Sequence, residues 1–201
     1  MSAQPLLSIL VPAVFDRGFA PVCTNLAEQA KDSREVEILL LYDNRMRSTG
    51  HKRQVLLDSA RGRYITCLDD DDDVAPDYLS VVLDAIRSAE QEIDVIVFNS
   101  QCVLNGGNPF VVRTGIEYEN EQCWQNEGRW SDIRRKPWHW CLWRSGLAKA
   151  ASFPDGYIDD DWFWLRQMIP LVKRQHRIDR VLHYYHYDKA RSLSNQGEAT
   201  T

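Results

Sequence analysis

The chain has 201 residues, of which 44% are hydrophobic and 26% are charged, and its net charge is −5. This length suits one sizeable core, so we expect a single domain over residues 1–201. No stretch approaches the roughly 20 consecutive apolar residues of a membrane helix, and the first residues lack the pattern of a secretion signal. We therefore expect a cytosolic protein without stable membrane association, and the negative charge argues against a general nucleic-acid binder.

Cysteine spacing and charge distribution narrow the class of protein further. The five cysteines are odd in number and never spaced as CxxC, so the sequence suggests neither a zinc knuckle nor a disulfide framework, and buried reduced thiols are expected. Residues 1–127 hold 11 basic and 21 acidic residues, whereas the remainder holds 13 basic and 8 acidic. An acidic first part suits metal binding and a basic second part suits the attraction of anions.

Apolar runs alternate with segments of helical spacing through the first half of the chain. The runs predict strands at 7–12, 36–43, 64–68 and 94–100, and helices at about 19–31, 51–61 and 76–90. In the second half we expect a hairpin around NGGN at 105–108, a long loop at 117–135, a helix at 160–174 and a last strand at 180–187. The alternation predicts an α/β fold with an open, mostly parallel sheet flanked by helices. In the helix at 51–61, the buried face is expected to comprise Val55, Leu56, Ser59 and Ala60.

Five consecutive aspartates, 69–73, directly follow the third predicted strand. Adjacent carboxylates repel one another and raise their neighbours' pKa unless a cation or hydrogen-bond donors compensate, and a divalent cation is the simplest compensation. The alternative is a solvated acidic loop. Because ligands of such sheets bind beyond the carboxyl ends of the strands, the position favours a phosphate- and metal-binding loop.

The segment YITCLDDDDDVAPDYL resembles the strand, Asp-x-Asp-Asp and proline of family 2 of the inverting glycosyltransferases, which have the Rossmann-like GT-A fold. The resemblance implies a nucleotide-sugar-binding half at 1–100 and a smaller acceptor-binding half at 101–201. It also implies that Asp69 and Asp70 contact the donor. Asp71 would bind the Mn²⁺ or Mg²⁺ ion that bridges the donor diphosphate.

Three further donor contacts follow from the same resemblance. LSILVPAVFDR resembles the family's first strand and nucleotide loop, which implies contacts from Pro12 and Asp16. Asp43 matches an aspartate that lies against the nucleobase, although the usual second aspartate is an asparagine here. Arg53 matches the arginine that reaches the nucleobase or the diphosphate, and its alternative is an ordinary helix-surface arginine.

Two segments near the C-terminus extend the resemblance to the catalytic and metal-binding residues. FPDGYIDDDWFWLRQM resembles the family's glycine-containing loop, acidic pair and following helix, which implies Asp160 as the general base and Asp159 as its acidic neighbour on the acceptor side. Helix capping is the alternative for such carboxylates. LHYYHYDKARSLSN resembles the closing strand, where a histidine completes the metal shell, so His186 and Asp188 are candidate ligands. The alternative for His186 is a structural role.

All seven tryptophans lie at or beyond position 124. Aromatic faces stack well on sugars and bases, whereas packing over the sheet is the alternative use of such side chains. The resemblance places Trp138, His139 and Trp140 in the region of the acceptor pocket, so they are candidate acceptor contacts.

The expected activity is metal-dependent transfer of a sugar, with inversion, from a nucleotide sugar to a soluble acceptor. We expect a UDP-sugar as donor, and a saccharide or a hydroxymethylated DNA base as acceptor. One alternative is a nucleotidyltransferase, but residues 13–18 lack the glycine-rich, lysine-bearing phosphate loop that such an enzyme needs. The other alternative is a nucleotide-sugar-binding module without catalysis.

Overall fold

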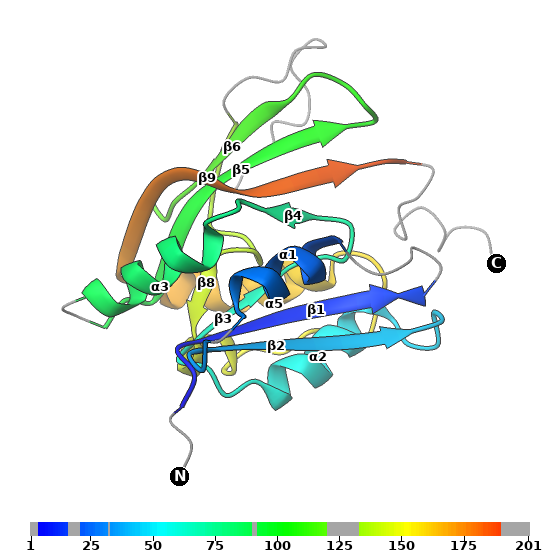
Figure 1. The fold of residues 1–201 in the computed structure, drawn as a ribbon, viewed down its shortest axis with the longest axis horizontal. Coiled ribbons are helices and arrows are strands. Elements are labelled where there is room, and N and C mark those ends of the chain that lie inside the picture. The colour runs from blue at the N-terminus through cyan, green and yellow to red at the C-terminus, as the bar shows by residue number, and fades with distance from the viewer. Residues whose placement is uncertain (1–3, 16–20, 32, 90–91, 120–132, 190–201) are drawn as a thin grey trace.

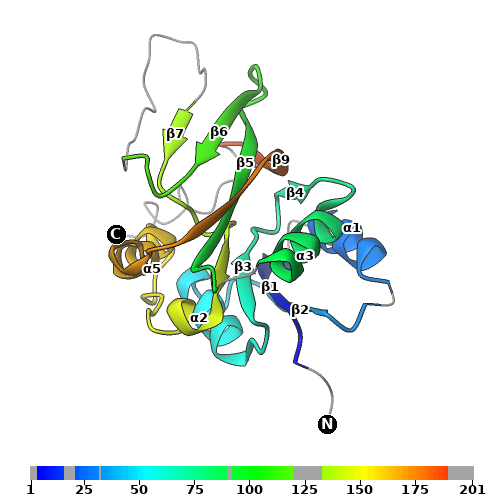
Figure 2. The same ribbon diagram turned by 90° about the vertical axis from the view of Figure 1, so that its left-hand side faces the viewer.

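The structure is a computed structural model that describes residues 4–15, 21–31, 33–89, 92–119 and 133–189. Its central sheet separates two pairs of helices (Figure 2). Helices α1 (Pro21–Gln29) and α3 (Tyr78–Ser88) pack together on one side. Helices α2 (Thr49–Ser59) and α5 (Asp160–Met168) contact each other on the other side. The predicted α/β architecture is thereby confirmed.

Nine strands of the described residues form the sheet, with the order β2-β1-β3-β8-β5-β6-β7 and with β9 pairing to both β4 and β5. Their bounds are β1 Leu7–Val14, β2 Val36–Asp43, β3 Tyr64–Cys67, β4 Asp73–Val74, β5 Val95–Leu104, β6 Phe110–Thr114, β7 Ile133–Arg135, β8 Leu142–Arg144 and β9 Gln175–Tyr187. β1 is parallel to β2 and β3, and β8 is antiparallel to both β3 and β5. Strands β1, β2, β3 and β5 therefore all point in one direction, and their carboxyl ends meet at one edge.

The long strand β9 pairs with both β5 and the short strand β4 (Figure 1). It runs parallel to β5, with register shifts around Asn99, and its second half pairs antiparallel with the short strand β4. β4 begins at the last residue of the acidic run, Asp73, which faces Tyr184. The loop that carries the carboxylates is therefore held between β3 and β9, a connection that the sequence did not predict.

Most predicted elements are confirmed, and the differences have local causes. The hairpin forms between β5 and β6, with Asn105 at φ 50° and Gly106 at φ 69°, values that asparagine and glycine adopt readily. Helix α5 ends at Met168 instead of residue 174 because Pro170 cannot continue a helix, and a short 3₁₀ helix, η2 (Ile169–Leu171), follows. Strand β7 lies within the segment predicted as a long loop, most of which falls outside the described residues.

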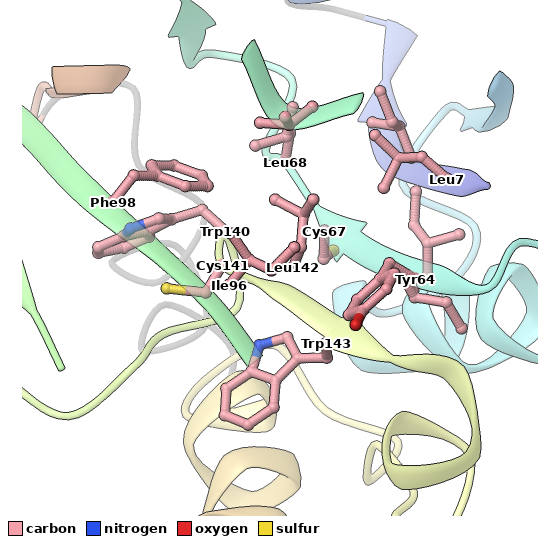
Figure 3. Close-up of a cluster of buried hydrophobic side chains, with 14 of the residues drawn as sticks. Leu7, Tyr64, Cys67, Leu68, Ile96, Phe98, Trp140, Cys141, Leu142 and Trp143 are labelled. Carbon is pink, nitrogen blue, oxygen red and sulfur yellow. The ribbon is translucent and has the colours of Figure 1, made fainter. Parts of the chain in front are cut away.

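The core lies where β3, β5 and β8 meet, and Figure 3 shows its buried side chains. Tyr64 and Leu68 of the β3 segment, Phe98 of β5 and Trp143 of β8 are all fully buried. The Trp143 indole also meets the Trp164 ring edge to face at 5.9 Å. Packing thus accounts for part of the tryptophan-rich segment, as the alternative interpretation held.

The predicted buried face of α2 is wrong in part. Val55 is 37% exposed and Ser59 is exposed, whereas Lys52 and Arg53 are buried together with Leu56 and Leu57. The helix is rotated so that its two basic side chains meet carboxylates inside the protein. Arg53 is therefore not the helix-surface arginine of the alternative interpretation. No helix among the described residues combines the length and apolar character that membrane crossing requires.

Candidate active site

One cavity of about 340 Å³ lies between the carboxyl ends of β1 and β3 and the start of α5. The predicted site residues among the described ones line it, apart from Asp43. They are Pro12, Arg53, Asp69, Asp70, Asp71, Trp138, His139, Trp140, Asp159, Asp160, His186 and Asp188. Asp16 lies outside the described residues, so its predicted donor contact stays a prediction.

The five aspartates of the acidic run point to different partners. Asp70 accepts the Val14 N–H at 2.9 Å, and Asp73 accepts from the Asn25 amide at 2.8 Å. Asp69 pairs with an arginine and Asp72 with a histidine, whereas Asp71 is exposed on the cavity wall. Protein groups thus supply much of the charge compensation for which the sequence analysis named a divalent cation as the simplest source.

The buried Arg53 guanidinium joins the acidic loop to the proposed base. Its Nη1 donates to Oδ2 of Asp160 at 2.7 Å, and its Nη2 donates to Oδ1 of Asp69 at 2.5 Å. Burial alone would raise the pKa of Asp69, but the charge of Arg53 and its hydrogen bond to the carboxylate help to lower that pKa to about 2. Burial raises the pKa of Asp160, and Arg53 opposes this rise only in part.

Asp160 reaches Arg53 because the loop before α5 packs directly on the first turn of α2. The Ser48 hydroxyl accepts the His51 N–H at 3.0 Å as the α2 N-cap. The Gly50 N–H donates to the Gly156 carbonyl at 2.9 Å, and a Cβ at Gly50 would lie only 1.9 Å from the Pro154 carbonyl oxygen. Only glycine allows this approach, which brings the start of α5 against the middle of α2.

Asp43 lies at the carboxyl end of β2 and is held by a buried lysine. Lys52 Nζ lies 2.5 Å from Oδ1 of Asp43 and donates to the Ala13 carbonyl at 2.7 Å. Burial tends to raise the pKa of Asp43, but hydrogen bonds and charge from Lys52 and Arg47 lower it. Lys52 itself lines the cavity and was not predicted, because a lysine on a helix normally faces solvent.

His183 is a second buried residue that the sequence analysis missed. Its Nε2 lies 3.0 Å from Oδ2 of Asp72, and its Nδ1 lies 2.8 Å from Oγ of Ser100. The Trp140 ring stacks on the imidazole at 4.9 Å and 11°. This network ties the acidic loop to β5 and β9. The last strand contains two histidines, His183 and His186, and the sequence analysis named only His186 as a candidate site residue.

Three candidate metal ligands share the cavity wall. Asp71, His186 and Asp188 all line it, and their carboxylate oxygens and imidazole nitrogen are ligand types that Mn²⁺ accepts. Over the described ranges, no three His, Cys, Asp or Glu side chains are grouped so as to hold a metal ion. The donor set therefore fits a divalent cation chemically, although its members are not brought together as a preformed cluster.

Aromatic side chains line the part of the cavity beside α5. The Trp138 ring stacks on Trp162 at 6.0 Å and 18°. His139 is buried, with Nδ1 3.0 Å from the Cys67 carbonyl oxygen and Nε2 3.5 Å from Oδ2 of Asp161. Trp140 is buried beneath them, so Trp138 is the most accessible of the three predicted acceptor contacts.

Comparisons with known proteins bear on the fold. No protein-family model matches the sequence, and no curated protein matches it. The structure is similar to crystal structures of S. aureus TarS. Residues 1–349 of TarS in complex with UDP-GlcNAc give a TM-score of 0.64 at 16% identity, over 94% of this chain and 60% of that chain.

Two further TarS structures agree with this similarity. The complex of residues 1–349 with UDP gives a TM-score of 0.60 at 16% identity, over 90% of this chain and 60% of that one. Another TarS crystal structure gives a TM-score of 0.60 at 17% identity, over 90% of this chain and 36% of that one. This chain therefore spans less than two thirds of the proteins it matches. Its fold is GT-A-like, with a mixed α/β sheet flanked by helices, as the resemblance implied.

Proposed function

We propose that this chain is a glycosyltransferase that moves a sugar from a UDP-sugar to a soluble acceptor. One observation carries the proposal: a single cavity collects the acidic loop after β3 and the buried Asp160 of α5. Support comes from the fold, which resembles that of TarS crystallised with UDP-GlcNAc and with UDP. A sugar transfer needs charge stabilisation at the departing diphosphate and a base at the acceptor, and the two parts of the cavity suit these tasks.

The donor would bind along the carboxyl ends of β1, β2 and β3, in the 1–100 half. Pro12 and Asp70 line this side, and Asp69 is kept ionised by Arg53. Asp43 lies outside the cavity lining, so its contact with the nucleobase stays a prediction, and Lys52 and Arg47 lower the pKa of its carboxyl. Lys52 holds Asp43 in place and adds positive charge to the cavity wall.

Asp71 would hold Mn²⁺ or Mg²⁺, with His186 and Asp188 as the further candidate ligands. When bound, the cation supplies charge neutralisation for the departing diphosphate. The other charges nearby belong to the chain itself. Arg53 balances Asp69 and Asp160, and Asp71 is exposed on the cavity wall.

Asp160 would accept the proton of the acceptor hydroxyl as that oxygen attacks the anomeric carbon. Burial raises its pKa, so its carboxylate is a stronger base than an exposed aspartate. Arg53 holds the carboxylate in position through Nη1. A single in-line displacement from the side opposite the diphosphate gives inversion. Trp138, His139, Trp140 and Asp159 would surround the acceptor in the 101–201 half.

A donor screen and one matched pair of substitutions test the proposal. A UDP-sugar with Mn²⁺ at a hundredfold excess over its Kd should stabilise the protein by about 2.7 kcal/mol in thermal unfolding. Asp160→Asn should lower turnover by about 10²–10⁴-fold without weakening UDP binding. The control Asp58→Asn alters an exposed carboxylate that accepts a hydrogen bond from Gln54 on its own helix, so turnover should not change.

The proposal fails if no nucleotide sugar stabilises the wild-type protein, or if Asp160→Asn keeps full turnover.

For the acceptor, we propose a saccharide or a hydroxymethylated DNA base, which the basic C-terminal part would attract. A gel-shift titration with duplex DNA at two salt concentrations tests the DNA option. Absence of salt-sensitive affinity would exclude it.

A further inference from the structure

Arg135, the last residue of β7, places a guanidinium on the cavity wall. Its Cζ lies 3.3 Å from the centroid of the Trp138 ring and 5.9 Å from that of Trp140. Among the residues that the structure describes, no carboxylate or carbonyl oxygen lies within hydrogen-bond or ion-pair distance of this guanidinium. Arg135 is thus held by aromatic faces instead of by an oxygen acceptor.

Other buried or half-buried arginines do have carboxylate partners. Arg53 pairs with two aspartates, Arg144 pairs with Asp94, and Arg177 pairs with Glu117. Burial lowers the pKa of Arg135 to about 10, and the negative charge of Asp161 opposes this only in part. Arg135 is therefore half-buried on the cavity wall, and among the described residues it lacks the carboxylate partner that these arginines have.

A ring face attracts a cation but accepts none of the five N–H groups of a guanidinium through a lone pair. The contacts with Trp138 and Trp140 therefore recover only part of the lost hydration. The planar fork of arginine matches the two oxygens of a phosphate or a carboxylate. An oxyanion that enters the cavity would complete the coordination of this group.

The position of Arg135 favours the acceptor over the donor. β7 ends the sheet order on the side away from β2, β1 and β3, whose carboxyl ends lie near the acidic loop (Figure 2). Trp138, which stacks on Arg135, also stacks on Trp162 of α5. Among the charges that act on Arg135, that of Asp161 is the strongest, and Asp161 is adjacent to the proposed base.

We propose that Arg135 binds an oxyanion on the acceptor, so that the acceptor is a hydroxyl compound carrying a phosphate or a carboxylate. This inference rests on the proposed function, because it assigns the acceptor class of the same site. Trp138 and Trp140 line the cavity beside the guanidinium and would contact the sugar ring of the acceptor. Arg135 is in this way a specificity residue.

Anion binding tests the proposal without any need for turnover. The protein is saturated with UDP and Mn²⁺, so that the donor side is filled, and inorganic phosphate or acetate is titrated by calorimetry. Arg135→Gln should weaken anion binding at least tenfold and leave the affinity for UDP within twofold. Arg135→Lys, which keeps the charge but loses the fork, should give an intermediate affinity. Arg134→Gln removes the same charge one residue away and outside the cavity lining, so anion binding should stay within twofold.

Acceptor preference gives a second readout. Sugar transfer from the donor found in the screen is measured with three acceptors. Glucose 6-phosphate carries a phosphate, glucuronate carries a carboxylate, and methyl glucoside is neutral. At least one anionic acceptor should exceed the neutral one tenfold in kcat/KM, and Arg135→Gln should remove that preference. The better of the two anionic acceptors identifies the source of the oxyanion.

Unchanged phosphate and acetate binding in Arg135→Gln would overturn the proposal, as would equal loss of UDP and anion affinity, which assigns Arg135 to the donor. If Arg135→Gln fails to fold, as judged by near-UV circular dichroism, Arg135→Lys provides the test. An Arg135→Lys protein that binds anions with wild-type affinity would overturn the role of the guanidinium fork. A wild-type protein that binds phosphate through Arg135 but does not bind any UDP-sugar supports the anion site and refutes the proposed function. The two failures are thereby distinguishable.

Discussion

Replacing Arg53 with glutamine tests whether the buried ion cluster holds the candidate site together. The wild-type guanidinium binds Asp160 at 2.7 Å and Asp69 at 2.5 Å, and its side chain is only 4% exposed. Glutamine keeps a polar end of smaller size but removes the charge. The two carboxylates would then face each other across the cavity wall without a cation between them.

The expected loss of stability follows from this geometry. Removing one partner of a buried ion pair costs about 3–5 kcal/mol, because the remaining charge stays buried without compensation. For a domain of about 200 residues each kcal/mol changes Tm by about 2–4 °C, so Tm should fall by about 6–20 °C. Adding Asp160→Asn to Arg53→Gln removes one of the uncompensated charges and should restore part of the loss.

The pH dependence of the two proteins should differ in the acid range. Arg53 is the strongest of the charges that hold the pKa of Asp69 at about 2, below the ordinary value of about 3.9. A lowered carboxylate pKa stabilises the fold above about pH 4, and this stabilisation is lost as pH falls towards 2. Arg53→Gln lacks this contribution, so its stability should depend less on pH between about 4 and 2.

Urea unfolding at pH 7, 4 and 3 measures these differences. Arg61→Gln is the matched control, since that side chain is 72% exposed and pairs with Glu37 at the surface. Its loss should stay below about 1 kcal/mol. The reasoning is refuted if Arg53→Gln also loses less than 1 kcal/mol, or if the double substitution with Asp160→Asn is no more stable than Arg53→Gln alone.

Further changes test the supports of the site. Gly50→Ala places a Cβ 1.9 Å from the Pro154 carbonyl oxygen, so urea unfolding should show a loss of about 1–3 kcal/mol, with lowered turnover. His183→Leu leaves the buried Asp72 carboxylate without its imidazole partner and should cost about 3 kcal/mol, whereas wild-type stability would contradict that role. Burial raises the pKa of Asp160, so kcat/KM measured from pH 4 to 8 should fall on acidification. The midpoint of this fall should lie above the ordinary aspartate pKa of about 3.9. A midpoint at or below that value would argue against Asp160 as the base.

The elements of the first half were predictable because local patterns determine them. VEILLLYD forms β2 with the predicted bounds, since an apolar run of this length, followed by a polar loop, suits a strand. The acidic run falls beyond the carboxyl end of β3, as expected. Which partner each aspartate of the run binds was not predictable, because the partners of Asp70 and Asp72 lie 56 and 111 positions away in the chain.

The face of α2 shows how tertiary contacts override periodicity. The spacing of Val55 and Leu56 suggested an apolar face, yet Lys52 and Arg53 are buried in its place. A buried charge is tolerated only where opposite charges or oxygen acceptors meet it, and these lie on β2, in the acidic loop and on α5. No pattern within the helix itself carries that information.

By itself, the sequence determined the strand and helix alternation, the place of the acidic loop and the candidacy of Asp160, because hydrophobic spacing and short motifs are local properties. Only the tertiary structure decided which carboxylates pair with Arg53 and His183, which tryptophans pack in the core, and that Arg135 lies against the Trp138 and Trp140 rings. These outcomes depend on burial and on contacts between residues distant in the chain. Desolvation and charge pairing acquire their energies only once the fold has brought those residues together.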